Sequence, residues 1–322
     1  HLTNSGIPTQ GIAFYHQSTL DLLQGLSCSV GLRYDYEHAR CDFSKVQQLL
    51  NGNGETKSLE QFNRSLHFGQ FTPRFSMQYL SSHNQLFYAS VSKGYKAGGF
   101  NVSFLNNDDY LYSPEYNWNY EIGTKLSFLN NRLSADLSLF YIDWRNQQIT
   151  NTIPTVGNVI RNAGRSRNKG IEASFQARPT KSWMMYMNYG YTDARFVHYQ
   201  KEERGILKDY GGNYLPMVPR HTFSLTTGYS FYDICSWIDR LTLNAGVSVT
   251  GPIYWYEDNQ AKQSPYALVN LRISINKGCF TWEVWSKNLT NTDYLSYYFV
   301  TSKAYAQKGK PITLGTSVSI SL

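Results

Sequence analysis

The chain ends on Ile312-Thr313-Leu314-Gly315-Thr316-Ser317-Val318-Ser319-Ile320-Ser321-Leu322, in which larger, mostly apolar residues alternate with small polar ones. Such a period of two is typical of a β-strand, because successive side chains of a strand point to opposite faces. The stretch 26–36 repeats the pattern, with Arg33 and Asp35 on its polar face. Charged residues inside an otherwise apolar strand require water on one side, so the pattern predicts a sheet between an apolar medium and water.

Strand-like segments of this kind recur along the whole chain. We expect about thirteen, with ends uncertain by two to four residues. They lie near residues 12–20, 26–36, 71–80, 85–94, 116–128, 132–144, 161–177, 183–193, 217–230, 240–250, 266–276, 279–288 and 311–322. Each has about ten residues, enough for a tilted strand to cross a hydrocarbon layer. No run of about 18 apolar residues is present in the sequence, which excludes a transmembrane helix and favours a β-barrel.

The connectors between these segments alternate in length. Short ones at residues 21–25, 81–84, 129–131, 178–182 and 277–278 alternate with long ones at residues 37–70, 95–115, 145–160, 194–216, 251–265 and 289–310. Bacterial outer-membrane barrels have short periplasmic turns and long extracellular loops. The sequence therefore predicts an all-β fold, an antiparallel up-and-down transmembrane β-barrel, whose C-terminus lies on the periplasmic side. Such barrels have an even strand number, so thirteen indicates one further strand or an incomplete barrel.

Composition narrows the class of protein. Aromatic residues make up 16% of the chain, yet the mean hydropathy is −0.44, as expected when apolar and polar positions alternate. The formal charge is +7, but Lys and Arg are scattered, so we expect no nucleic-acid partner. Cys28, Cys41, Cys235 and Cys279 lack the spacing of metal ligands, and we expect neither a bound metal nor a cofactor.

Aromatic residues cluster where strands meet connectors, at 116–120, 186–191 and 254–256. Rings of this kind form the girdles of membrane barrels at both interfaces. The alternative interpretation is that they are core aromatics of a soluble β protein.

Six further segments follow one another between residues 92 and 294. They are Ser92-Lys93-Gly94-Tyr95-Lys96-Ala97-Gly98-Gly99-Phe100-Asn101; Ser113-Pro114-Glu115-Tyr116-Asn117-Trp118-Asn119-Tyr120-Glu121-Ile122-Gly123-Thr124-Lys125; Phe140-Tyr141-Ile142-Asp143-Trp144-Arg145-Asn146-Gln147-Gln148; Asn162-Ala163-Gly164 with Gly170-Ile171-Glu172; Val218-Pro219-Arg220-His221; and Lys287-Asn288-Leu289-Thr290-Asn291 with Tyr294. In this order they resemble the segments shared by TonB-dependent outer-membrane receptors of the siderophore type.

The resemblance implies a barrel of about 22 strands whose lumen holds an N-terminal plug domain. Residues 1–322 would then be the C-terminal portion of the barrel, with the plug and the early strands outside this chain. TonB would act through the segment that precedes the barrel. One departure is the last residue, because the family usually ends on an aromatic residue and this chain ends on Leu322.

The alternation also assigns candidate residues to the lumen. Glu121 and Glu172 are out of phase with Ile122 and Ile171, so their carboxylates are expected to face the lumen. We expect a lumen-facing set of Glu121, Lys125, Glu172 and Gln176. These residues would contact either the plug or basic neighbours in the wall, and nearby strands favour the wall.

Arg and exposed aromatic rings suit bulky anionic ligands such as ferric siderophores and haem. The long connectors offer both, and the candidate ligand-binding residues are Arg161, Arg165, Arg167, Tyr254, Trp255, Tyr256, Tyr297, Tyr298 and Tyr305. Alternatively, such rings belong to the girdle and such basic residues bind lipopolysaccharide phosphate.

The sequence and the resemblance together predict an outer-membrane receptor that imports a scarce small-molecule ligand, most simply a ferric siderophore, with energy from TonB. Haem and cobalamin are alternative substrates. A passive pore or truncated barrel, and a surface-binding adhesin, are alternative functions. No nucleophile elbow or phosphate loop is present in the sequence, so we do not expect an enzyme.

Overall fold

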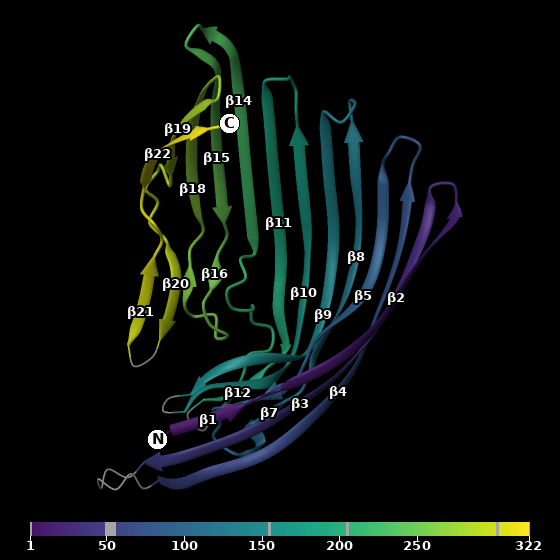
Figure 1. Cartoon of the computed structure of the whole chain (residues 1–322), viewed down its shortest axis with the longest axis vertical. Helices are drawn as coiled ribbons and strands as arrows, with labels where there is room; N and C mark the ends of the chain where they lie inside the picture. The colour runs from purple at the N-terminus through teal and green to yellow at the C-terminus, as the bar shows by residue number, and fades with distance from the viewer. Residues whose placement is uncertain (1, 49–55, 154–155, 204–205, 301–302, 322) are drawn as a thin grey trace.

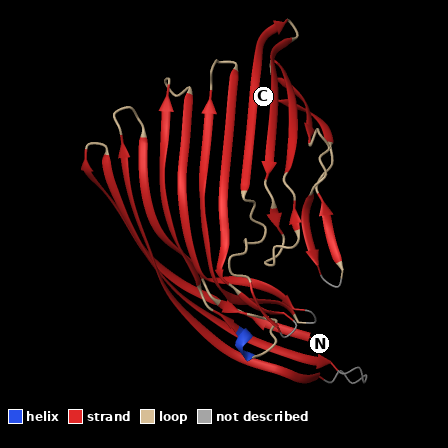
Figure 2. Ribbon diagram, turned by 180° about the vertical axis from the view of Figure 1, so that it is seen from behind, coloured by secondary structure: helices blue, strands red, loops and turns tan. Residues whose placement is uncertain are grey.

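The computed structural model describes residues 2–48, 56–153, 156–203, 206–300 and 303–321 (Figure 1). Its main element is one curved antiparallel sheet, seen from behind in Figure 2. The strands of this sheet are β1 (Leu2–Gly6), β2 (Thr9–Leu23), β3 (Leu26–Gln48), β4 (Thr56–Leu80), β5 (Leu86–Lys96), β8 (Glu115–Phe128), β9 (Leu133–Ile153), β10 (Gly157–Ala177), β11 (Trp183–His198), β14 (His221–Cys235), β15 (Ile238–Thr250), β18 (Tyr266–Lys277), β19 (Phe280–Lys287) and β22 (Thr313–Ile320).

Successive strands of this sheet are neighbours, which is the up-and-down topology predicted from the sequence. The strands β1 and β2 both pair with β3, through Leu2↔Val46 and Thr9↔Ala39. They form one strand interrupted at Pro8, which has no N–H to donate to a ladder. The fourteen strands among the described residues therefore occupy thirteen positions, and all thirteen expected segments are confirmed.

Strand register separates an apolar face from a polar face. Leu139 lies opposite Ile122 on one side and Ile171 on the other, and directly opposed residues share a face. This outward face is strongly exposed, as at Phe14 (66%) and Ile122 (58%). Apolar exposure of this extent requires an apolar medium around the wall. The other face, called the inner face here, carries polar side chains.

The short connectors lie together at one end of the wall, at the top of Figure 1. Gly25 ends the first of them with φ of +78°, and a Cβ there would lie 2.2 Å from the carbonyl oxygen of Leu80. The carbonyl oxygen of Gly25 accepts the N–H of Leu80 at 2.7 Å, which holds the β2–β3 turn against the end of β4. Strand β22 ends at this same end, because Ile320 pairs with Phe280 next to a short turn. Leu322, the last residue of the expected strand 311–322, lies outside the described residues.

The long connectors are more structured than the sequence predicted. Strands β3 and β4 run on through much of the expected connector 37–70, and β9 and β10 through most of 145–160. Smaller elements fill the others: β6 (Gly99–Phe100), η1 (Asn107–Tyr110), β7 (Leu111–Tyr112), β12 (Gln200–Glu203), β13 (Ile206–Asp209), β16 (Ile253–Tyr254), β17 (Lys262–Gln263), β20 (Leu295–Val300) and β21 (Ala304–Lys308).

A reversal of polarity explains why the extension of β3 was missed. Up to Tyr36 its apolar residues point outward, but Ala39, Cys41 and Phe43 lie on the inner face and are buried. They pack with Phe100 of the following long connector. The period of two continues, but its apolar residues move to the other face, so the apolar pattern changes phase near residue 37. This reversal also marks the edge of the outward apolar band on β3.

Among the described residues, the structure contains no helix with the length and apolar character needed to cross a membrane. The four cysteines are unpaired, and Cys41 is fully buried.

Candidate ligand-binding rim

The connector between β5 and β8 is tied to β9 and β10 by side-chain hydrogen bonds to backbone. Buried Asn101 donates to the carbonyl oxygens of Asp109 and Ile160, both at 2.7 Å, and accepts the N–H of Ile160 at 2.8 Å. Asn162 donates to the carbonyl of Ser113 at 2.8 Å and accepts its N–H at 2.7 Å. In these contacts a side-chain amide both donates to and accepts from the backbone, as a neighbouring strand would. The connector is therefore attached to the wall.

Three of the family-like sequence segments meet in this network. Gln148 donates to the carbonyl of Ala97 at 2.8 Å, and its own N–H is accepted by the carboxylate of Glu115 at 2.5 Å. Glu115 is 6% exposed. The segments that begin at Ser92, Ser113 and Phe140 therefore contribute to one structural joint.

Arg161, a predicted ligand-binding residue, is engaged in the same joint. Its guanidinium donates to the two carboxylate oxygens of Asp109 at 2.7 and 2.9 Å. The pKa of Asp109 is lowered, first by the hydrogen bond from Arg161 and despite burial, with further help from the N–H of Leu105. Arg161 therefore orders the connector, and a direct contact with a ligand stays a prediction.

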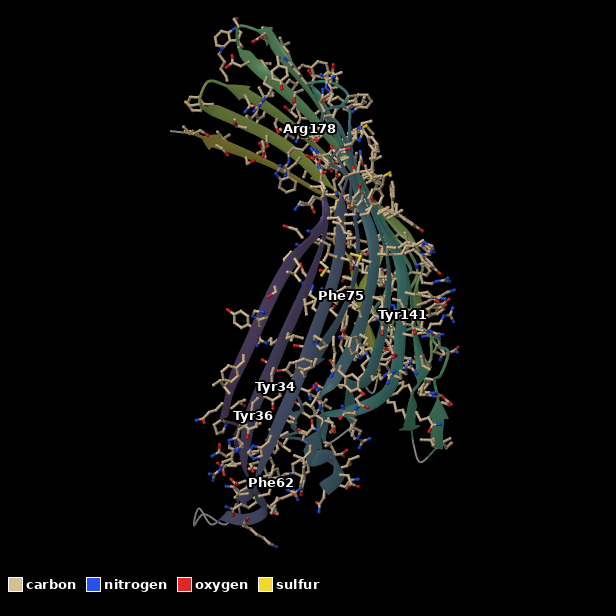
Figure 3. The ribbon with its side chains drawn as sticks, turned by 90° about the vertical axis from the view of Figure 1, so that its right-hand side faces the viewer. Tyr34, Tyr36, Phe62, Phe75, Tyr141 and Arg178 are labelled. Carbon is tan, nitrogen blue, oxygen red and sulfur yellow. The ribbon has the colours of Figure 1, made fainter. Side chains whose placement is uncertain are left out.

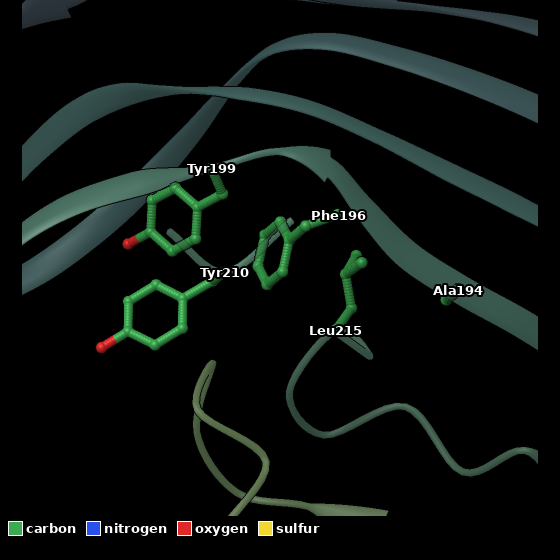
Figure 4. Packing of buried hydrophobic residues seen from close by; sticks show 5 residues of the cluster. All are labelled: Ala194, Phe196, Tyr199, Tyr210 and Leu215. Atoms are coloured by element: carbon green, nitrogen blue, oxygen red, sulfur yellow. The ribbon is translucent and has the colours of Figure 1, made fainter. Parts of the chain in front are cut away.

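The connector between β11 and β14 folds onto the inner face of β11. Its small core consists of Ala194, Phe196, Tyr199, Tyr210 and Leu215, all buried (Figure 4). Residues 213–215 continue the wall beside β11, because Leu215 donates to the carbonyl of Ala194 at 3.0 Å and Phe196 donates to that of Asn213 at 3.0 Å. This core positions Tyr214 at the rim.

The structure brings together the predicted aromatic residues of two long connectors. Trp255, 5% exposed, meets Tyr297 edge-on at 6.3 Å between ring centroids, and Tyr256 meets Tyr298 in the same way at 6.2 Å. The hydroxyl of Tyr256 also accepts the N–H of Val300 at 2.5 Å. Burial raises the pKa of Tyr256. The two connectors are thus joined by edge-to-face pairs, which favour a fixed relative arrangement.

The same aromatic group extends in both directions. Tyr254 stacks on Tyr214 at 5.5 Å and 7°, while Tyr297 leads through Phe299 to Tyr305 at centroid distances of 5.8 and 5.1 Å. We call this group the aromatic rim; it comprises Tyr214, Tyr254, Trp255, Tyr256, Tyr297, Tyr298, Phe299 and Tyr305. Trp255 Nε1 is buried without a hydrogen-bond partner in the structure.

Two cations lie against the aromatic rim that the sequence did not reveal as site residues. The guanidinium carbon of Arg195 is 3.9 Å from the centroid of the Tyr214 ring, and that of Arg220 is 4.9 Å from it. Arg195 Nη2 also donates a hydrogen bond to the hydroxyl of Tyr214, which adds to this contact. Arg195 is distant from Tyr254 in sequence, and the β11–β14 connector joins them only in the fold. Arg220 lies in the family-like segment Val218-Pro219-Arg220-His221. That segment was the one sequence signal that could have identified Arg220 as a site residue.

The inner face carries the predicted lumen-facing residues. Tyr88 donates to Glu121 at 2.6 Å from the neighbouring strand β5. Lys125 lies opposite Asp136, Glu172 opposite Ser138, and Gln176 opposite Ser134. The roles of these four residues stay predictions.

Nearer the rim, several inner-face polar atoms of β8, β9 and β10 are covered without a partner in the structure. They are Asn119 Oδ1, Trp144 Nε1, Ser166 Oγ and Asn168 Oδ1. Ser166 is 0% exposed. Buried polar atoms normally have hydrogen-bond partners, so this part of the wall is suited to receive further polar groups.

Arg165 and Arg167 lie on the opposite, outward face. Arg167 is opposite Asp143 and Arg165 is opposite Arg145, in phase with the outward residue Ile171. Asp143 accepts from Arg165 at 2.5 Å and from Arg145 at 2.9 Å. The structure thus separates these two arginines from the inner face. Among the described residues, no group of three or more His, Cys, Asp or Glu side chains is placed to hold a metal ion.

Comparison with known proteins gives a consistent family. Residues 2–291 match the family model described as TonB dependent receptor-like, beta-barrel. The probable TonB-dependent siderophore receptor PiuA of Acinetobacter baumannii is 26% identical over 241 residues, which cover 70% of this chain and 30% of that protein. The pesticin receptor of Yersinia pestis is 24% identical over 334 residues, covering 99% of this chain and 45% of that protein.

Solved structures agree on the fold. The ferric yersiniabactin uptake receptor FyuA from Yersinia pestis superposes with a TM-score of 0.82 at 21% identity, covering 99% of this chain and 46% of that one. The siderophore receptor PiuA from Acinetobacter baumannii gives 0.76 at 20% identity, covering 97% and 42%. The chain spans less than half the length of these relatives.

Proposed function

Because the chain belongs to the TonB-dependent receptor family, whose barrel model it matches over residues 2–291, we propose that the whole protein imports a ferric siderophore across the outer membrane. The aromatic rim with its two arginines is the observation that carries this proposal. A ferric siderophore is bulky, often anionic and partly aromatic. Rings at the rim match its aromatic parts, and guanidinium groups match its negative charge.

The placement of the wall in the membrane follows from its two ends. The long connectors, with the aromatic rim, face outward from the cell in this proposal, and the short turns face the periplasm. In this orientation the end of β22, which lies on the short-turn side, would be at the periplasmic surface. The outward apolar band lies between the two ends, where lipid surrounds it.

Capture at the rim is the first step that the residues of this chain support. Tyr214 offers a ring against which Arg195 and Arg220 already lie, and Asp193 pairs with Arg195 at 2.8 Å, so the positive charge beside the aromatic surface is partly neutralised. Register places Arg195 opposite both Arg167 and Tyr214, so this contact lies at the outward edge of the rim. The neighbouring Trp255 and Tyr256 are fixed by Tyr297 and Tyr298. A preordered rim loses less side-chain entropy when a ligand binds, which favours affinity.

Passage inward is the second step. The plug is the partner we expect for the inner face, where Asn119, Ser166 and Asn168 have covered polar atoms without partners. TonB, acting on the plug, would supply the energy. A passive pore would need neither the plug nor TonB, and an adhesin would need only the outer rim.

A binding panel tests the ligand class. The full-length protein is titrated with ferric phenolate, catecholate and hydroxamate siderophores, and separately with haem and with cobalamin. The proposal expects tight binding of one ferric siderophore and at least tenfold weaker binding after Tyr214→Leu, which removes the ring from both arginines. A control, Tyr232→Leu, changes an exposed tyrosine of β14. Binding of haem or cobalamin alone would contradict the proposed substrate class.

A further inference from the structure

The inner face of the last strands of the wall carries a second group of aromatic and basic residues, separate from the aromatic rim. Register places Asn244, Arg272 and Trp285 at one level of β15, β18 and β19. Ile273 and Val284, which alternate with them along the strands, are exposed on the outward face. Figure 3 shows the wall from its side, with side chains projecting from both faces. Arg272 and Trp285 therefore face the lumen.

These residues line an open cavity of about 390 Å³, a volume in the range of small-molecule sites. Its lining includes Thr226, Asn244, Gly246, Arg272, Trp285 and Lys287. The Trp285 ring lies over Gly315 of β22, where a Cβ would be 2.2 Å from ring atom Cζ2. Gly315 thus leaves the room that the indole ring needs to lie against the wall.

Two cations stand beside the Trp285 ring. Lys287 Nζ is 5.4 Å from its centroid, and Arg272 lies directly opposite Trp285 with a side chain that is 53% exposed. Glu283 approaches Arg272 only to 3.8 Å, and its carboxylate also accepts Ser274 Oγ at 2.8 Å. Among the described residues that line the cavity, Arg272 and Lys287 are cations and none is an acid. The cavity therefore combines an aromatic surface with a net positive charge.

A track of small side chains leads from the aromatic rim to this cavity. Strand β14 begins and β15 ends at the connectors that carry Tyr214 and Tyr254. From there the inner positions of the two strands are Thr222, Ser224 and Thr226, and Thr250, Ser248 and Gly246. Each set extends about 14 Å along its strand. With residues of β10 and β11, the outer part of the track lines a further open cavity of about 430 Å³. A bulky ligand can follow this track without displacing long side chains.

From this arrangement we infer that the cavity at Trp285 is a second binding site for the imported iron complex, occupied after capture at the rim and before release to the periplasm. The inference rests on the proposed function and narrows its substrate class to phenolate or catecholate complexes. Their aromatic chelating groups stack on Trp285, and their negative charge meets Arg272 and Lys287. Arg272 lies near the middle of β18, so the site divides the passage into two shorter steps.

The test separates surface binding from uptake in cells that express the complete gene. Radio-iron complexes of a phenolate, a catecholate and a hydroxamate siderophore are given one at a time. The variant Arg272→Gln/Lys287→Gln should bind the imported complex at the surface as the unchanged protein does. Its TonB-dependent uptake should be about fivefold slower, which corresponds to about 1 kcal/mol. The matched control, Arg178→Gln/Lys181→Gln, removes the same two charges from the short turn between β10 and β11 and should import at the unchanged rate.

The aromatic surface is tested by a pair of substitutions at one position. Trp285→Leu should slow uptake to a similar extent, whereas Trp285→Tyr, which keeps a ring, should retain most of the rate. Unchanged surface binding verifies that each variant is folded and reaches the outer membrane. Equal uptake by the leucine and tyrosine variants would overturn the role of the ring.

The other outcomes distinguish this site from its alternatives. Uptake by the charge variant at the unchanged rate would overturn the inference, and so would an equal loss of surface binding, which would assign the two cations to capture. TonB-independent entry of a bulky glycopeptide antibiotic through the charge variant would also overturn it, because the cavity would then hold the plug. Import of the hydroxamate complex alone would overturn the inference and leave the proposed function standing. Uptake of no complex by the unchanged protein would contradict the proposed function itself.

Discussion

Arg161 on β10 holds Asp109 in the β5–β8 connector through two hydrogen bonds, at 2.7 and 2.9 Å, although 52 residues separate them in sequence. The Asp109 carboxylate is 6% exposed and the Arg161 side chain 39%. The pair therefore attaches the connector to the wall, and its loss should release the connector rather than unfold the barrel.

The first prediction concerns Asp109→Asn. The change leaves Arg161 without its charged partner, and we expect a local cost of about 1–3 kcal/mol. Limited proteolysis should therefore cut within residues 101–112 at least several times faster than in the unchanged protein. A control, Asp108→Asn, alters the exposed neighbouring carboxylate. Equal cleavage of the Asp109 and Asp108 variants would contradict the role of the ion pair.

The same pair predicts a pH dependence. Because the pKa of Asp109 in the fold lies below its ordinary value of 3.8, the pair stabilises the connector fully above that value. The stabilisation is lost as the pH falls below 3.8 toward the lowered pKa. Hydrogen exchange of the amide of Leu105, which donates to Asp109, should accelerate in this window beyond the intrinsic rate. A protection factor that stays constant down to pH 2 would be inconsistent with this.

A third prediction uses tryptophan fluorescence. Trp255 is 5% exposed within the aromatic rim, whereas Trp237 is 82% exposed beside the β14–β15 turn at the other end. Ligand binding at the rim should change the emission of Trp255, so Trp255→Phe should abolish most of the ligand-dependent signal. Trp237→Phe should retain it. The reverse result would place the ligand away from the rim.

The fourth prediction concerns folding of the wall. Gly25→Ala puts a Cβ 2.2 Å from a backbone oxygen at a φ of +78°, so the β2–β3 turn must move. The left-handed backbone alone costs about 1–2 kcal/mol for a residue with a Cβ. We expect a clearly lower yield of folded barrel after refolding into detergent. Gly6→Ala, where a Cβ meets no atom within 4 Å, is the control and should refold normally.

The sequence determined the wall better than the rim. Period-two alternation located all thirteen strand positions of the main sheet among the described residues, because each lies between lipid-like and water-like surroundings, as Val30 and Arg33 do on β3. It lost β3 beyond Tyr36, since Ala39 and Cys41 carry the apolar stripe on the other face. That reversal depends on a connector packing from elsewhere in the chain, which no local pattern reports.

The sequence identified candidate site residues by their type, but it did not show which of them the fold brings together. Trp255 and Tyr297 were both selected by type, and the fold brings them together. Arg165 and Arg167 were selected for their charge beside a connector, but only strand register shows that they share the face of Ile171. Arg195 was missed because its contact with Tyr214 arises from a connector that returns to its own strand.

TonB-dependent uptake of iron is the direct measure of the proposed import. Cells that express the complete gene are given the radio-iron complex of the siderophore that binds best, with and without functional TonB and with the Tyr214→Leu variant. We predict iron accumulation that requires both TonB and the intact rim, while surface binding persists without TonB. Iron accumulation that is equal with and without TonB would contradict it and indicate a passive pore.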